Sequence, residues 1–188
     1  MILPRTTPRR AMSRRTGKLP WLLLLLWSTW LFAFQGRIAV HGNWGDWAPD
    51  LGLLLVLSLD ARVPRELAWR VACVVALARI ATSADPPLAI LVGYLGLVGF
   101  AGPLRELVLL DGPLARALFA ALATLTLGCF LVITQGTLQP GVSYGAGFGP
   151  TALESCWRSA VSTGVIALFF LPYLRGLPGL SPLLRTGR

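Results

Sequence analysis

Long apolar runs constrain this chain more than any other feature. One of them is LPWLLLLLWSTWLFAFQ (residues 19–35), and over the 188 residues 55% are hydrophobic and only 13% charged. A soluble globule needs more polar surface than such a composition supplies. A helix crosses a bilayer with about 20 apolar residues, or somewhat fewer where charged flanks reach the interface. The sequence therefore predicts an all-α integral membrane protein.

The apolar runs divide into six predicted transmembrane helices. The second, PDLGLLLVLSLDARV, is short, and the third carries Arg70 and Arg79, so we expect both to be short or irregular. These two segments could be full spans or a re-entrant hairpin, and either arrangement returns the chain to the side on which it began. The predicted segments are 19–35, 49–63, 66–84, 86–101, 113–135 and 152–174.

The basic residues predict the orientation in the membrane, because Lys and Arg concentrate in cytoplasmic loops. Residues 1–18 carry six bases without apolar periodicity, which predicts a disordered cytoplasmic tail and not a nucleic-acid-binding surface. A polytopic domain over 19–175 and a short cytoplasmic tail over 176–188 follow. Both termini are predicted to be cytoplasmic, because the other bases of the connections and the C-terminus fall on the same side: Arg62, Arg65, Arg105, Arg116, Arg175, Arg185 and Arg188.

Residues suited to catalysis or metal binding are sparse. His41 is the single histidine and lies in a predicted loop, so no intramembrane base is available for an activated nucleophile. Cys73, Cys129 and Cys156 are far apart and lack metal or redox spacing. We therefore expect a protein that is not an enzyme and that uses no cofactor or metal.

The third segment presents one face of small residues. Ala68, Ala72, Ala76, Arg79 and Ser83 follow one another at intervals of three or four, which places them on the same side of a helix. Small residues at this spacing let neighbouring helices approach closely. We expect this face to point into the bundle, as a surface for helix packing or for a partner, and to carry Arg79 with it.

Arg79 is predicted to lie too deep to reach the interface easily. It precedes Asp85 by six residues, about 9 Å of helix rise, and helical side chains lean toward the N-terminus of their helix, here deeper into the membrane. An unpaired arginine at such depth costs about 3 kcal/mol, so a counter-charge is expected. Asp50, in the Pro49–Asp50 start of the second helix, and Asp85 are the candidates.

The role of these charges is left open by the sequence. Asp85, followed by Pro86, is typical of an N-cap with proline at the first helical position. Arg79 has no such local explanation. It could form a structural ion pair that fixes the hairpin, or it could contact a ligand or a partner.

Three stretches resemble a known family: WAPDLGLLLVLSLDARVPRE (47–66), ALARIATSADPPLAILVGYLGLVGFAGPLREL (76–107) and AVSTGVIALFFLPYLRGL (160–177). Together they resemble the rod shape-determining protein MreD family of bacteria. The chain departs from that pattern in the third segment. The family commonly has a Gly-rich third helix with an acidic residue before a small-Pro-Leu-Gly turn, whereas this chain has alanines, Arg79 and SADPPLA. The residues that carry the resemblance are Pro49, Asp50, the run 51–57, Arg62, Pro64, Pro172, Leu174 and Arg175.

The resemblance implies a non-catalytic scaffold in the bacterial cytoplasmic (inner) membrane. Such a protein would bind an MreC-like membrane protein and help couple MreB filaments to the transpeptidase and polymerase of peptidoglycan synthesis. The family offers no catalytic residues to carry over. The working surfaces would be the small-residue face, the Pro49–Asp50 start and the outer loop 136–151.

A second function is compatible with the same size, helix number and charge. The substrate-binding membrane subunit of a vitamin transporter of the energy-coupling-factor type would hold a polar, partly enclosed cavity near the outer face. Arg79, Asp50, Trp44 and Trp47 could line such a cavity. The two functions differ in their partners: an MreC-like protein for the scaffold, or an ATPase pair with its coupling subunit for the transporter.

Overall fold

The structure, a computed structural model, describes residues 18–42, 44–107, 112–138, 150–174 and 177–184. Within these ranges the chain is all-helical and contains no strand. Its α-helices are α1 (Lys18–His41), α2 (Leu51–Asp60), α3 (Arg65–Thr82), α4 (Pro87–Leu107), α5 (Pro113–Leu138) and α7 (Pro150–Leu174), with the short 3₁₀ helices η1 (Gly45–Trp47) and η2 (Ser181–Leu183). Each described α-helix overlaps one of the predicted segments, although α4 continues to Leu107, beyond the predicted end at 101.

The α1 helix is longer than predicted. Residues 36–41 were expected to begin an outer loop, yet they continue the helix to His41, and the N–H of Gly42 closes the last turn on the carbonyl of Ile38 at 3.0 Å. Gly36 does not end the helix, since no proline follows it and Arg37, Ile38 and Ala39 are all compatible with helical geometry. This part of the loop prediction was wrong.

The α2 helix is short and deeply enclosed. Its ten residues extend about 15 Å, half the thickness of a bilayer core, and every residue from Leu51 to Ser58 is buried. A turn over Ala61–Pro64 leads into α3, with the N–H groups of Arg62 and Val63 both bonded to the carbonyl of Leu59. The expectation of a short second helix is confirmed, whereas α3 is one continuous helix of 18 residues and is not irregular.

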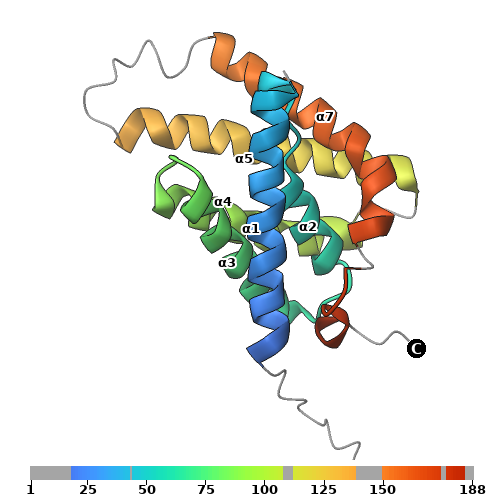
Figure 1. Cartoon of the computed structure of the whole chain (residues 1–188). Helices are drawn as coiled ribbons and strands as arrows, with labels where there is room; N and C mark the ends of the chain where they lie inside the picture. Colours follow the sequence, from blue (N-terminus) through green and yellow to red (C-terminus); the bar gives the residue numbers. More distant parts are fainter. Residues whose placement is uncertain (1–17, 43, 108–111, 139–149, 175–176, 185–188) are drawn as a thin grey trace, which may run out of the picture.

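The other helices pack around α2 and α3. In Figure 1, α1 stands upright in the view, and α5 runs across behind it. The α3 helix contacts α1, α2 and α4, while α5 packs most extensively against α7. Gly164 of α7 makes the close approach to α5 possible, because a Cβ there would lie 3.0 Å from Ala121 Cβ and 3.2 Å from the Ala117 carbonyl oxygen.

The C-terminal segment returns to the first half of α1. Leu180 and Leu183 are each only 1% exposed, and Trp27 Nε1 donates to the carbonyl of Pro178 at 3.4 Å. Gly179 has a φ of +83° and lies against Leu23, so the turn needs a residue without a side chain. Figure 1 shows η2 near the start of α1. Residues 177–184, predicted as part of a tail, are thus packed against the helical body.

Two of the described helices are long and apolar enough to cross a membrane: Lys18–His41, which is α1, and Pro113–Gln135 within α5. A shorter apolar stretch, Pro87–Ala101, forms the first part of α4. The protein is therefore an all-helical chain, in its described part, with two candidate membrane-spanning helices.

Candidate functional site

Asp50 lies where three helices meet. Its side chain caps α2 by accepting the Leu53 N–H on Oδ1 at 2.9 Å, and the residue is only 5% exposed. The Asp50 N–H donates to Thr163 Oγ1 of α7 at 2.9 Å, and the next N–H, of Leu51, donates to Gln35 Oε1 of α1 at 3.2 Å. The buried Pro49–Asp50 start of α2 is thereby joined to both α1 and α7.

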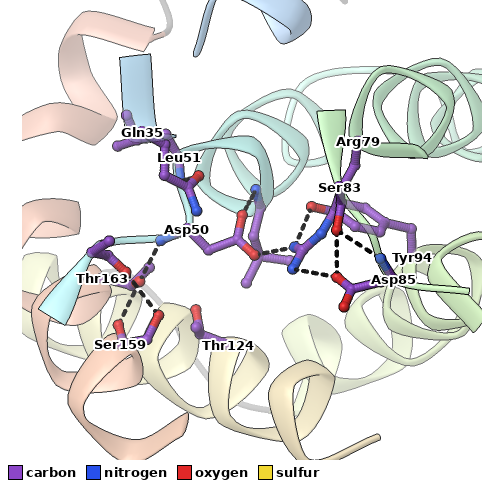
Figure 2. Close-up of polar contacts among 12 residues, drawn as sticks. Gln35, Asp50, Leu51, Arg79, Ser83, Asp85, Tyr94, Thr124, Ser159 and Thr163 are labelled. Atoms are coloured by element: carbon purple, nitrogen blue, oxygen red, sulfur yellow. Dashed lines mark hydrogen bonds and ion pairs between the residues drawn. The ribbon is translucent and has the colours of Figure 1, made fainter. Parts of the chain in front are cut away.

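Arg79 of α3 provides the counter-charge of Asp50. Its Nη1 lies 2.5 Å from Asp50 Oδ2 and 3.2 Å from the hydroxyl of Tyr94, whose ring lies 5.7 Å from the guanidinium carbon (Figure 2). Tyr94 belongs to α4 and is fully buried. The side chain of Arg79 is only 17% exposed, so the ion pair connects α2, α3 and α4 inside the helical body.

Asp85 lies beside the same arginine and does not cap α4. The helix begins at Pro87, two residues later, so the N-cap prediction was wrong. The second of the two consecutive prolines takes the first helical position, and the carboxylate is used elsewhere. Asp85 Oδ2 accepts from Ser83 Oγ at 2.7 Å and lies 3.9 Å from Arg79 Nη2, while Oδ1 accepts from Gln135 Nε2 of α5.

The small-residue face lies inside the body. Ala68, Ala72 and Ala76 are at most 2% exposed, and Arg79 continues the same side of α3. Ser83 lies just after the end of the helix, with its hydroxyl bonded to Asp85. In the described part of the structure, this face therefore packs against other helices of the same chain. It ends at the polar cluster of Asp50, Arg79 and Asp85.

A cavity of about 290 Å³ opens beside this cluster. Asp50, Arg79 and Asp85 line one side of it, and residues of η1, α5 and α7 line the other sides. Trp44 and Trp47, expected in such a cavity, are not among its lining residues. Trp47 packs edge-on against Trp157 with ring centroids 5.9 Å apart, and the guanidinium of Arg158 lies over its ring.

Four residues that bond to the cluster were not predicted from the sequence: Gln35, Tyr94, Gln135 and Thr163. Tyr94 leaves one usable signal, because a tyrosine inside an apolar helix needs a partner for its hydroxyl. Thr163 and Gln135 leave no such signal, because each lies on a helix that is distant in the sequence. A threonine inside a helix can also bond only to a carbonyl of its own helix, so its type does not indicate a distant partner. Their roles depend on how α5 and α7 cross.

The arrangement is suited to holding charge and binding polar groups. Among the described residues, no group of three His, Cys, Asp or Glu side chains could hold a metal ion. His41 is exposed at the end of α1. No protein-family model, curated protein or solved structure matches the chain.

Proposed function

We propose that this protein is a multi-pass membrane scaffold of the bacterial elongation machinery, of the MreD type. It would bind an MreC-like membrane protein in the cytoplasmic membrane and help couple cytoplasmic MreB filaments to peptidoglycan synthesis. In this proposal the chain is not an enzyme and works through its helix faces and loops.

The observation that carries the proposal is the role of Pro49 and Asp50. These residues carry part of the family resemblance, and the contacts of Asp50 and its neighbour reach α1, α3 and α7. A buried, fully bonded start of a helix fixes the relative positions of its neighbours. A rigid helical body with its polar groups satisfied internally is what a scaffold requires.

The arrangement of the helix ends supports a topology with both termini cytoplasmic. In Figure 1, the start of α1 and the turn between α2 and α3 lie toward the bottom of the view, whereas η1 lies at the top. Lys18, Arg62 and Arg65 belong to the lower ends.

Co-expression with a tagged MreC-like protein from the same bacterium tests the scaffold function. We expect the two proteins to co-purify after solubilisation in a mild detergent, whereas an unrelated single-span membrane protein carrying the same tag should not recover the chain. Recovery equal to that of the unrelated control would contradict the proposal.

The cavity favours a second candidate, the substrate-binding subunit of an energy-coupling-factor transporter. A polar, partly enclosed space beside Asp50 and Arg79 is what such a subunit needs. Its volume of about 290 Å³ is at the lower limit for a ligand site, so the cargo would be small. Recovery of an ATPase pair with its coupling subunit, in place of the MreC-like protein, would select this function.

A further inference from the structure

The cavity beside Asp85 has an imbalance of charge that the ion pair does not remove. Three carboxylates, from Asp46, Asp50 and Asp85, line it together with one guanidinium, from Arg79. Arg79 lies 2.5 Å from Asp50, and Asp46 lies 3.8 Å from Arg158. Asp85 is therefore the carboxylate with the weakest ion pair.

The contacts of Asp85 show how weak this ion pair is. Its Oδ2 lies 3.9 Å from Arg79 Nη2, at the outer limit of an ion pair, whereas its hydrogen bonds come from two uncharged donors, Ser83 and Gln135. The Asp85 side chain is 21% exposed. A largely buried carboxylate that is hydrogen-bonded by neutral donors retains most of its negative charge and attracts a further cation.

The other residues that line the cavity indicate what kind of ligand could fit beside Asp85. Leu127, Gly128, Leu131 and Val132 of α5 supply apolar surface. Ser155 and Ser159 of α7 also line the cavity, and their hydroxyls donate to the carbonyls of Ala152 and Ala48. The volume of about 290 Å³ admits a compact molecule only. A small apolar group that carries a positive head fits both the shape and the charge.

We propose that this cavity binds the ammonium group of a small organic amine, with Asp85 as the ion-pairing carboxylate. The ammonium group would lie between Asp85 and the η1 side of the cavity, and the carbon body would lie against α5. This inference goes beyond the scaffold function and does not depend on it. The amine could be a free molecule or the amino headgroup of a phospholipid, since both offer the same chemistry.

Binding of three matched probes tests the proposal. Cyclohexylmethylamine, cyclohexylmethanol and cyclohexanecarboxylate have rings of the same size and differ in charge. They would be measured by equilibrium dialysis against the full chain in phosphatidylglycerol nanodiscs, with empty nanodiscs subtracted. We expect saturable binding of the amine, at least tenfold tighter than that of the alcohol or the carboxylate.

Two variants of Asp85 separate charge from shape. Asp85→Asn keeps the size of the side chain and should weaken amine binding at least tenfold, whereas Asp85→Glu keeps the charge and should retain most of it. Glu154→Gln is the matched control, because Glu154 is a carboxylate of α7 that pairs with Arg158 outside the cavity lining. This control should bind the amine within twofold of the parent.

Other results would overturn the proposal. These are equal binding of the amine by the parent and a folded Asp85→Asn variant, or a carboxylate or alcohol probe that binds as tightly as the amine. If Asp85→Asn does not fold, the order of the three probes in the parent decides. The source of the amine is read from nanodiscs that contain phosphatidylethanolamine: competition against cyclohexylmethylamine assigns the lipid headgroup, and unchanged affinity assigns a free amine. Capture of an MreC-like protein is measured independently, so either proposal can fail alone.

Discussion

The pairing of Arg79 with Asp50 is the most deeply buried ion pair among those described. Both side chains are at least four-fifths buried, at 17% and 7% exposed, and they meet at 2.5 Å. Removing one member of such a pair leaves an uncompensated buried charge, which costs about 3–5 kcal/mol. The loss of stability on mutation therefore reflects mainly the charge that is left buried without a partner, and less the net stabilisation that the ion pair provides.

We expect Arg79→Leu and Arg79→Ala each to lower the free energy of unfolding by about 3–5 kcal/mol. Denaturation in detergent, followed by tryptophan fluorescence, measures this. In a double-mutant cycle with Asp50→Asn, the double variant should lose less than the sum of the single losses, because asparagine is neutral and still caps a helix. Strictly additive losses would show that the two residues do not interact.

A surface pair provides the control for this cycle. Arg158 and Glu154 also form an ion pair, four residues apart on α7, but their side chains are 33% and 49% exposed. Glu154→Gln removes this pair alone and should change the free energy of unfolding by less than about 1 kcal/mol. The exchange of Arg79→Asp with Asp50→Arg should rescue only in part, because an arginine at position 50 cannot accept the Leu53 N–H that Asp50 accepts.

Thr163 is the only side-chain acceptor shown for the buried N–H of Asp50 among the described contacts. Thr163→Val keeps the shape of the side chain but leaves that N–H without its partner, so we expect a loss of about 1–3 kcal/mol. Thr126→Val is the matched control, since the exposed Thr126 hydroxyl bonds to the Leu122 carbonyl of its own helix. The same unfolding measurement should show less than about 0.5 kcal/mol for the control, and equal losses for both variants would contradict the role of Thr163.

The residue-level predictions from the sequence were uneven for a physical reason. Arg79 could be assigned a counter-charge because a deep, unpaired arginine is costly and few acids were available nearby. Asp85 was misassigned, because two consecutive prolines give two possible helix starts and only the packing selects Pro87. The partner of Asp85 on α5, Gln135, depends on a contact between residues 50 positions apart.

At the scale of elements, the packing of α7 on α5 depends on small residues. A Cβ at Gly164 would lie 3.0 Å from Ala121 Cβ and 3.2 Å from the Ala117 carbonyl oxygen, and neither of these atoms can rotate away. The two helices would have to separate to admit a methyl group. Such overpacking costs about 1–3 kcal/mol.

We therefore expect Gly164→Ala to lower the free energy of unfolding by about 1–3 kcal/mol, despite the better helix propensity of alanine. Gly36→Ala in α1 is the matched control, since nothing lies within 4 Å of a Cβ built there. Its expected effect is neutral or stabilising, measured in the same detergent unfolding assay. A stabilising effect of Gly164→Ala would show that α5 and α7 are not in close contact.

Helix positions were predictable because hydrophobic runs and punctuation determine them locally. The short α2 was predicted from its length, and the described helices α3, α4, α5 and α7 each overlap the corresponding predicted segment. The end of α1 was missed because Gly36 and Arg37 interrupt the apolar run, and only the tertiary structure selects between helix and loop for residues 36–41. The packing of Leu180 and Leu183 against the body was missed because it depends on contact with the distant α1.

At the scale of the whole molecule, both proposed functions require a chain that crosses the membrane several times with both termini on the cytoplasmic side. The structure itself supplies two candidate spans, α1 and part of α5. The short α2 and the charged α3 could cross the bilayer only as members of a packed group, because their polar residues are satisfied inside the body.

Cysteine accessibility in intact bacterial cells tests this topology most directly. In a background with Cys73, Cys129 and Cys156 replaced by alanine, single cysteines are placed at four exposed positions: His41 and Ala84 on one side, Ala61 and Ser181 on the other. We predict that a membrane-impermeant maleimide labels cysteine at 41 and 84, and labels cysteine at 61 and 181 only after the membrane is permeabilised. Labelling of all four positions in intact cells, or of 61 and 181 alone, would contradict the account.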